Sequence, residues 1–166
     1  CLSAWLAPVL CYTAEEAWIS FRNEDNSSIH LEEFPKISSK HLNSKLIEKW
    51  SSLRRIRRVI TGALEVARQE KIIGSSLDAK IIIYSKNKDY FKLLESLDID
   101  ELCIVSSSLL SKNNVPETAY KEENIDDIGV KVLKAEGKKC DRCWKIDKKL
   151  NNSICKRCSE VIKNNE

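Results

Sequence analysis

The longest regular pattern of apolar positions lies in the middle of the chain. Between Ser44 and Lys71, apolar residues recur every three or four positions, which is the spacing of one helix face. The stripe consists of Leu53, Ile56, Ile60, Ala63, Leu64 and Ala67. The pattern therefore predicts one long helix over residues 44–71. Arg54 and Arg58 fall opposite the stripe on a helical wheel, so they are predicted to face away from its packed side.

Shorter patterns before this helix predict two helical segments and a connection. Residues 2–10 form an apolar helical end that a proline interrupts, because proline lacks the N–H of a helical residue. Thr13 and Glu16 have the spacing of a capping box, which predicts a helix start at Thr13. Residues 22–39 contain four Ser, two Asn, one Asp and one Pro. They predict a connection with a short extended piece at residues 29–31.

After the long helix the periodicity changes. A β-branched run at residues 79–84 predicts a strand, and residues 90–97 predict a short amphipathic helix. A second apolar run follows at residues 102–105, and residues 111–127 predict a polar, acidic loop. Residues 130–132 then alternate between valine and lysine, as in an edge strand. Together these patterns predict a small α/β layer.

The patterns divide the chain into three predicted domains. Residues 1–74 predict an α-helical bundle fragment, residues 75–134 a small α/β junction, and residues 135–166 a cysteine-containing module. Apolar residues make up 42% of the sequence, which is enough for a folded core. No run approaches the roughly 18 apolar residues of a membrane span, and a secretory signal pattern is absent. We therefore expect a cytoplasmic protein, and the lack of methionine together with the apolar first residues predicts the tail of something larger.

Four of the seven cysteines form two tight pairs near the C-terminus. Their pattern is Cys140-x2-Cys143-x11-Cys155-x2-Cys158. Two residues between cysteines let both sulfurs of a pair face one point, and two such pairs supply the four thiolates of a tetrahedral zinc site. All four positions around the metal are then filled by protein. The spacing therefore predicts one structural Zn²⁺ ion rather than a catalytic one.

The cysteine-containing module has few apolar residues, so metal binding is expected to replace a core. A thioredoxin-like redox pair is less favoured, because one pair of cysteines would suffice for it. An iron or iron–sulfur site is the other alternative. The remaining cysteines, Cys1, Cys11 and Cys103, stand singly among apolar residues and are predicted to be small core residues without chemistry.

Basic charge is concentrated around the cysteines. Residues 134–166 hold 10 Lys and Arg against 5 Asp and Glu, whereas the rest of the chain holds 18 against 20. Arg142, Trp144, Lys145 and Arg157 lie within or beside the cysteine pairs. Cations beside an indole can hold a nucleic-acid backbone and stack on an unpaired base. The sequence leaves open the alternative that Trp144 covers the metal site and the lysines keep the module soluble.

Several stretches together resemble the C-terminal part of bacterial isoleucyl-tRNA synthetases. They are LAPVLCYTAEEAW at 6–18, IHLEEFP at 29–35, RRVITGALEVARQEKIIGSSLDAKI at 57–81, AEGKKCDRCW at 135–144 and ICKRC at 154–158. This resemblance covers nearly the whole chain in the expected order. It implies an anticodon-binding type of helical bundle fragment, a small α/β junction and a four-cysteine zinc-binding module that contacts tRNA.

The resemblance also implies a parent enzyme that joins isoleucine to its tRNA with ATP. His30 and His41 do not form the His-x-Gly-His signature of a class I site, and no Lys-Met-Ser-Lys-Ser loop is present. ATP is therefore expected to bind upstream domains of a monomeric parent, and this segment is expected to grip the anticodon arm of the isoleucine tRNA without catalysis. The predicted tRNA contacts are Arg54, Arg58, Arg142, Trp144, Lys145 and Arg157.

Two further functions remain as alternatives. The first is a zinc-ribbon module that binds a protein, with the helical part as its scaffold and the lysines as solubilising residues. The second is a sequence-specific DNA-binding protein, which is disfavoured because the chain has no zinc-finger spacing of two cysteines and two histidines and no clear recognition helix.

Overall fold

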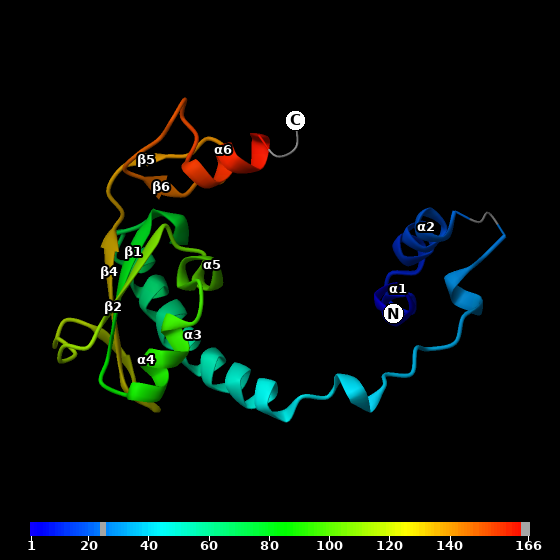
Figure 1. The fold of residues 1–166 in the computed structure, drawn as a ribbon, viewed down its shortest axis with the longest axis horizontal. Helices are drawn as coiled ribbons and strands as arrows, with labels where there is room; N and C mark the ends of the chain where they lie inside the picture. The colour runs from blue at the N-terminus through cyan, green and yellow to red at the C-terminus, as the bar shows by residue number, and fades with distance from the viewer. Residues whose placement is uncertain (24–25, 164–166) are drawn as a thin grey trace. The chain divides into compact units, whose positions relative to one another are not determined.

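The computed structural model describes residues 1–23 and 26–163 (Figure 1). Residues 24–25 of the predicted connection, and residues 164–166 of the predicted cysteine-containing module, lie outside the described residues. The chain divides into two compact units, Cys1–Ser44 and Lys45–Glu166. Among the described residues, no helix is both long and apolar enough to cross a membrane.

The N-terminal unit is built from short helices around a very small core. Its elements are the helices α1 (Leu2–Leu6) and α2 (Cys11–Arg22) and the 3-10 helices η1 (Ile29–Leu31) and η2 (Ser39–His41). The buried residues are Ala7, Ala14 and Ile29, against which Ala4 and Trp18 pack. Two of these buried residues are alanines, so this core buries little apolar surface.

The predicted capping box at Thr13 and Glu16 is wrong. Helix α2 begins at Cys11, and its N-cap residue is Leu10, which offers no side-chain cap. The Leu10 N–H donates to the Leu6 carbonyl at 2.8 Å, so the turn after α1 continues directly into α2. Thr13 therefore lies inside the first turn of the helix.

The connection after α2 is tied back to that helix by Glu15. Its carboxylate accepts hydrogen bonds from the Ile29 N–H at 2.9 Å and the Ser28 hydroxyl at 3.0 Å. Residues 29–31 form the 3-10 helix η1 rather than the predicted extended piece. The reason is local, because the Ser28 hydroxyl accepts the His30 N–H and caps the turn.

In the second unit, the predicted long helix is confirmed as α3 (Ser44–Gln69), and all six residues of its apolar stripe are buried. From Ile56 onward the stripe packs against a four-stranded sheet, with Ile60 of α3 in the same core as Ile81 and Val130. The second unit therefore contains both helices and a sheet, as the predicted α/β layer requires. The prediction of a helical bundle is correct only in part, because the apolar face of α3 packs against the sheet. Periodicity reveals a packed face but not the element that covers it. The predicted boundaries after residues 74 and 134 stay a prediction.

The sheet has the strand order β2-β1-β4-β3. Its strands are β1 (Ala79–Ser85), β2 (Ser107–Ser111), β3 (Tyr120–Glu122) and β4 (Ile125–Lys134). Strands β1 and β2 are parallel and are joined through helices α4 (Lys88–Glu95) and α5 (Ile99–Cys103), whereas β4 runs antiparallel to both β1 and β3. The strand and helix predicted at residues 79–84 and 90–97 are thus present as β1 and α4, the latter shifted toward the N-terminus.

Other predictions for this layer need correction. Residues 130–132 belong to an interior strand, since β4 pairs on both sides. The predicted loop at residues 111–127 contains β3 and the start of β4. The apolar run at residues 102–105 ends helix α5, and the second parallel strand follows it at Ser107–Ser111. The serine-rich β2 lacks an alternating apolar pattern because it lies at the edge of the sheet.

The cysteine-containing module follows β4. A two-stranded antiparallel sheet, β5 (Lys138–Lys139) with β6 (Ile146–Asp147), precedes the terminal helix α6 (Lys156–Lys163). Gly137 leads into β5 with a φ of +135°, a conformation that side chains rarely adopt. A Cβ at this position would lie 2.3 Å from the Asp147 carbonyl oxygen. The close approach of the two strands therefore requires glycine here.

Candidate metal centre and nucleic-acid interface

The first pair of cysteines lies in a closed turn between β5 and β6. The Trp144 N–H donates to the Cys140 carbonyl and the Cys140 N–H donates to the Lys145 carbonyl, both at 2.9 Å. Trp144 adopts a left-handed conformation, with a φ of 67°. These bonds curl the backbone between Cys140 and Cys143, so both sulfurs face the interior of the module.

The second pair lies at the start of α6. Cys155 precedes the helix and Cys158 lies within it. The Cys155 N–H donates to the Cys140 sulfur at 3.3 Å, which joins the two pairs across 15 residues of sequence.

All four cysteine sulfurs lie within 4.8 Å of one another. Cys140, Cys155 and Cys158 are buried, and Cys143 is half-buried. The distance between the Cys143 and Cys155 sulfurs is 3.6 Å, well beyond the roughly 2 Å of a disulfide bond. The spacing and the chemistry of the donors fit a single metal ion held by these four residues.

The thiols of this cluster differ in acidity. Burial raises the pKa of Cys140, but backbone N–H groups, that of Cys143 foremost, outweigh burial and lower the pKa to about 6. Burial raises the pKa of Cys143 to about 12 and also raises the pKa of Cys155. Without a cation, Cys143 would therefore keep its proton at neutral pH, and a bound metal ion would offset the cost of forming four thiolates close together.

The other three cysteines lie outside this cluster. Cys103 is buried, as predicted, and burial raises the pKa of its thiol to about 11. Cys1 and Cys11 are exposed in this chain, so the prediction of core positions is wrong for both. Their apolar sequence neighbours are themselves largely exposed, which explains why the pattern misled.

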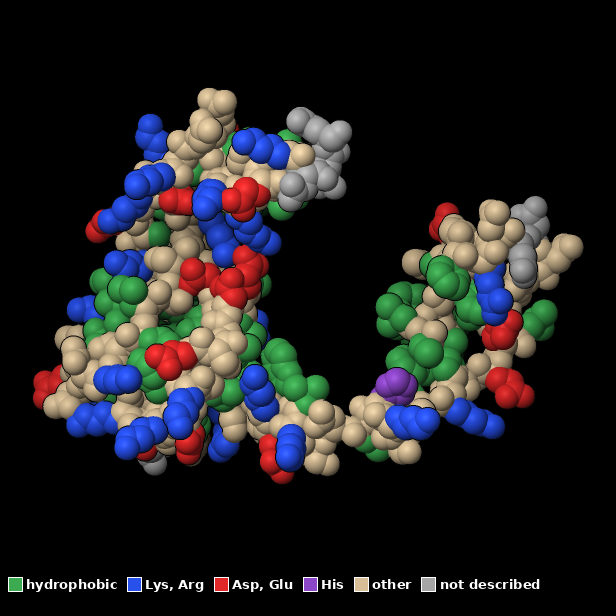
Figure 2. Space-filling model, in the orientation of Figure 1, with side chains coloured by type: hydrophobic (Ala, Val, Ile, Leu, Met, Phe, Trp, Pro, Cys, Tyr) green, Lys and Arg blue, Asp and Glu red, His purple; other side chains and the backbone are tan. Residues whose placement is uncertain are grey.

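Two of the predicted tRNA contacts form an exposed surface on the first cysteine turn. Trp144 is 60% exposed, and Arg142 beside it is also exposed. The Lys139 ammonium lies 5.3 Å from the centre of the Trp144 ring, which is a cation–π contact. Figure 2 shows Lys and Arg side chains spread over the visible face of the second unit. The exposed surface of Arg142, Trp144 and Lys139 can present both positive charge and an aromatic face.

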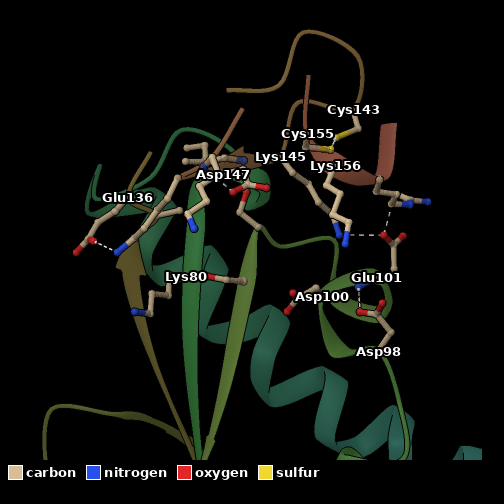
Figure 3. A pocket seen from close by; sticks show the side chains of 17 residues that line it. Lys80, Asp98, Asp100, Glu101, Glu136, Cys143, Lys145, Asp147, Cys155 and Lys156 are labelled. Carbon is tan, nitrogen blue, oxygen red and sulfur yellow. Dashed lines mark hydrogen bonds and ion pairs between the residues drawn. The ribbon is translucent and has the colours of Figure 1, made fainter. Parts of the chain in front are cut away.

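The other two predicted contacts of the module are held by a carboxylate. Lys145 and Arg157 both form ion pairs with Glu101 of α5, at 2.9 Å and 3.0 Å. Figure 3 shows Lys145 and Glu101 beside a pocket of about 530 Å³ between α5 and the module. The Lys145 side chain is only 20% exposed. Lys145 thus binds Glu101, whereas Arg142 and Trp144 are exposed, although the three are near neighbours in sequence.

The two predicted contacts on α3 are exposed and lie one turn apart. The Arg58 side chain is 75% exposed and forms an ion pair with Glu122 of β3 at 3.2 Å. Arg54 donates a long hydrogen bond of 3.4 Å to the Trp50 carbonyl of its own helix. Their polar partners thus lie on α3 and β3, not in the cysteine-containing module.

Sequence reasoning missed the structural role of Arg57. Its guanidinium donates to the Leu102 carbonyl of α5 at 3.1 Å, across 45 residues of sequence. On a helical wheel Arg57 lies at the edge of the apolar stripe, which is the only signal in the sequence and does not identify the partner.

Comparisons with known proteins agree with this arrangement. Residues 2–83 match the family model described as the anticodon-binding domain of tRNA ligase. The chain is 41% identical to an isoleucine–tRNA ligase of Agrobacterium fabrum over 88% of its length, and 42% identical to that of Bradyrhizobium diazoefficiens over 86%. It is 38% identical to that of Caldicellulosiruptor saccharolyticus over 98% of its length. The chain spans only about 14% to 18% of the length of these relatives.

Proposed function

Because residues 2–83 match the model of the anticodon-binding domain of tRNA ligase and most of the chain resembles isoleucine–tRNA ligases, we propose that it is a tRNA-binding C-terminal portion of such an enzyme. The parent enzyme would attach isoleucine to its tRNA with ATP. This segment would grip the anticodon arm while the chemistry takes place in other domains. Energy from that remote contact would help to place the tRNA 3′ end for transfer.

The metal in this proposal is one structural Zn²⁺ ion bound by Cys140, Cys143, Cys155 and Cys158. A tetrahedral zinc with bonds of about 2.3 Å places its sulfurs about 3.8 Å apart, which suits four sulfurs that all lie within 4.8 Å. Beyond the cysteines, only Leu150 and Ile154 pack in this cluster among the described residues, so the metal would replace a core. We also place the parent in the cytoplasm, where reducing conditions keep such cysteines as thiols.

The observation that carries the proposal is the exposed Trp144 beside Arg142, directly on the cysteine turn. An exposed indole with cations around it suits an unpaired base and its phosphates, both of which an anticodon loop offers. Arg54 and Arg58 would contact the RNA backbone from α3. Lys145 and Arg157 are weaker candidates, because Glu101 already neutralises part of their charge.

Titrations of the zinc-loaded chain with three nucleic acids test the proposal. We expect the isoleucine tRNA to bind more tightly than another tRNA, and both to bind more tightly than duplex DNA. Because phosphate contacts release counterions, the logarithm of the affinity should fall linearly with the logarithm of the salt concentration. Weak, indiscriminate binding would instead favour the alternative of a zinc-ribbon module that binds a protein. A flat response to salt would contradict the phosphate contacts.

A further inference from the structure

Helix α5 is a short element that is fixed at both ends. The Asp98 carboxylate accepts the Glu101 N–H at 3.0 Å and caps the N-terminus of the helix. At the other end, Ile104 takes a left-handed conformation, and its N–H bonds back to carbonyls of the last turn. Ile99 and Cys103 are buried in the core beneath. The Glu101 carboxylate is therefore presented from a well-defined backbone.

Polar contacts connect α5 to α3 on one side and to the cysteine-containing module on the other. Arg57 of α3 donates to the Leu102 carbonyl at 3.1 Å. On the module side, one oxygen of Glu101 binds both Lys145 and Arg157 (Figure 3). These two cations come from different halves of the module, one beside each pair of cysteines. A single carboxylate thus contacts both halves.

The residues that follow α5 add a second attachment. The Ser106 hydroxyl accepts the Ile146 N–H at 2.6 Å and donates to the Leu77 carbonyl. Beside these contacts lies the pocket of about 530 Å³, so the module does not close against the layer by continuous apolar packing. Its angle to α3 depends on a few polar contacts, and among the described residues Glu101 forms ion pairs with the module through both Lys145 and Arg157.

We propose that Glu101 is a positioning residue that holds the cysteine-containing module at a fixed angle to α3. The angle sets where Arg142 and Trp144 stand relative to Arg54 and Arg58. Lys145 then serves docking rather than RNA contact. This inference rests on the proposed tRNA binding for its consequence, but the docking itself can be tested without RNA.

The two roles that Glu101 could have predict different results for Glu101→Gln. If Glu101 merely neutralised RNA-binding cations, Glu101→Gln would raise the affinity for every RNA, because the basic surface would lose a negative charge. A positioning role predicts a lower preference for the isoleucine tRNA over another tRNA, by about fivefold. The matched control is Glu117→Gln, which removes the same charge from an exposed residue in the loop between β2 and β3.

Amide hydrogen exchange of the full zinc-loaded chain tests the docking. In Glu101→Gln, the Ile146 amide, which bonds to Ser106 across the contact, should exchange about tenfold faster. The Cys155 amide, which bonds to a sulfur inside the module, should stay unchanged, as should the metal content. Glu117→Gln should change neither amide.

Any result that differs from these expectations would contradict the inference. Unchanged Ile146 exchange would show that Glu101 does not hold the module, and loss of metal would show that it supports the fold of the module instead. Faster Ile146 exchange with an unchanged or increased preference for the isoleucine tRNA would exclude a positioning role in recognition. If the unmodified chain fails to distinguish tRNAs, the proposed function fails, whereas the exchange result still decides whether Glu101 docks the module.

Discussion

At the residue scale, Trp144 links the fold of the metal centre to its surface. Its backbone closes the first cysteine turn through the bond to Cys140, while 60% of the residue is exposed. The backbone bond does not depend on the side chain, so a substitution that keeps the Cβ can remove the ring and leave the turn intact. The indole can therefore be tested separately from the metal.

We predict that Trp144→Ala weakens binding of the isoleucine tRNA without releasing zinc. Loss of one stacked base costs about 1–3 kcal/mol, which corresponds to roughly fivefold to 150-fold in affinity. A tRNA titration with parallel measurement of metal content provides the test. Trp144→Phe keeps an aromatic face and should retain most of the affinity. Zinc loss with unchanged affinity per folded molecule would show that the indole only covers the metal site.

Gly137 provides a second test at this scale. Gly137→Ala should destabilise the β5–β6 pairing by about 1–3 kcal/mol, because its φ is +135° and an added Cβ would meet the Asp147 backbone at 2.3 Å. Thermal unfolding in the presence of limiting zinc would report the loss. Gly74→Ala is the matched control, because there the nearest atom is a side-chain oxygen of Asp78, at 3.2 Å. Equal effects of both substitutions would contradict this account.

At the element scale, the four-cysteine cluster and the apolar core lie in different parts of the second unit. The cluster around the cysteines has three buried residues, all of them cysteine, whereas α3 and the sheet share a separate core of 17 buried residues in the described part of the chain. The module should therefore depend on metal, and the rest of the unit should not.

Removal of zinc with a strong chelator should abolish amide protection across residues 138–160 and leave α3 and β1 protected. In zinc-finger peptides a structural Zn²⁺ ion supplies about 10–16 kcal/mol of folding free energy, which the few apolar contacts of this module could not replace. Hydrogen exchange with mass spectrometry can follow both regions at once. Cys155→Ser should have the same effect as the chelator, and Cys11→Ser, at an exposed cysteine, should have none. Retained protection of the module after chelation would exclude a structural role for the metal.

The sequence predicted those elements whose signals are local. The α3 stripe and the spacing of the four cysteines are each complete within one stretch of chain, and the structure has the helix and brings the four sulfurs together. The sheet that covers α3 was not predictable, because periodicity does not identify a partner. The contacts of Glu101 with Lys145 and Arg57 with Leu102 join residues 44 and 45 positions apart, so no pattern along the chain reveals them.

At the scale of the whole molecule, the two compact units differ in how much apolar surface each buries. The described part of the N-terminal unit has three buried core residues, two of them alanine, whereas several of its large apolar side chains are exposed. The most exposed are Leu2, Val9, Tyr12, Phe21, Leu31 and Leu42, with values between 68% and 91%. Burial of apolar area is the main source of stability, so this unit has little to offset its loss of chain entropy.

We therefore predict that the N-terminal unit is the least stable part of the isolated chain. Amides of α1 and α2 should exchange at rates close to those of an unfolded peptide, because local opening there exposes little that is buried. Amides of α3 and β1 should be protected by several orders of magnitude in the same experiment, since both elements lie in the larger core. The two units thus serve as internal references for each other at one temperature and pH. Uniformly high protection across residues 1–21 would contradict the argument, because it would require a source of stability that the three buried side chains do not provide.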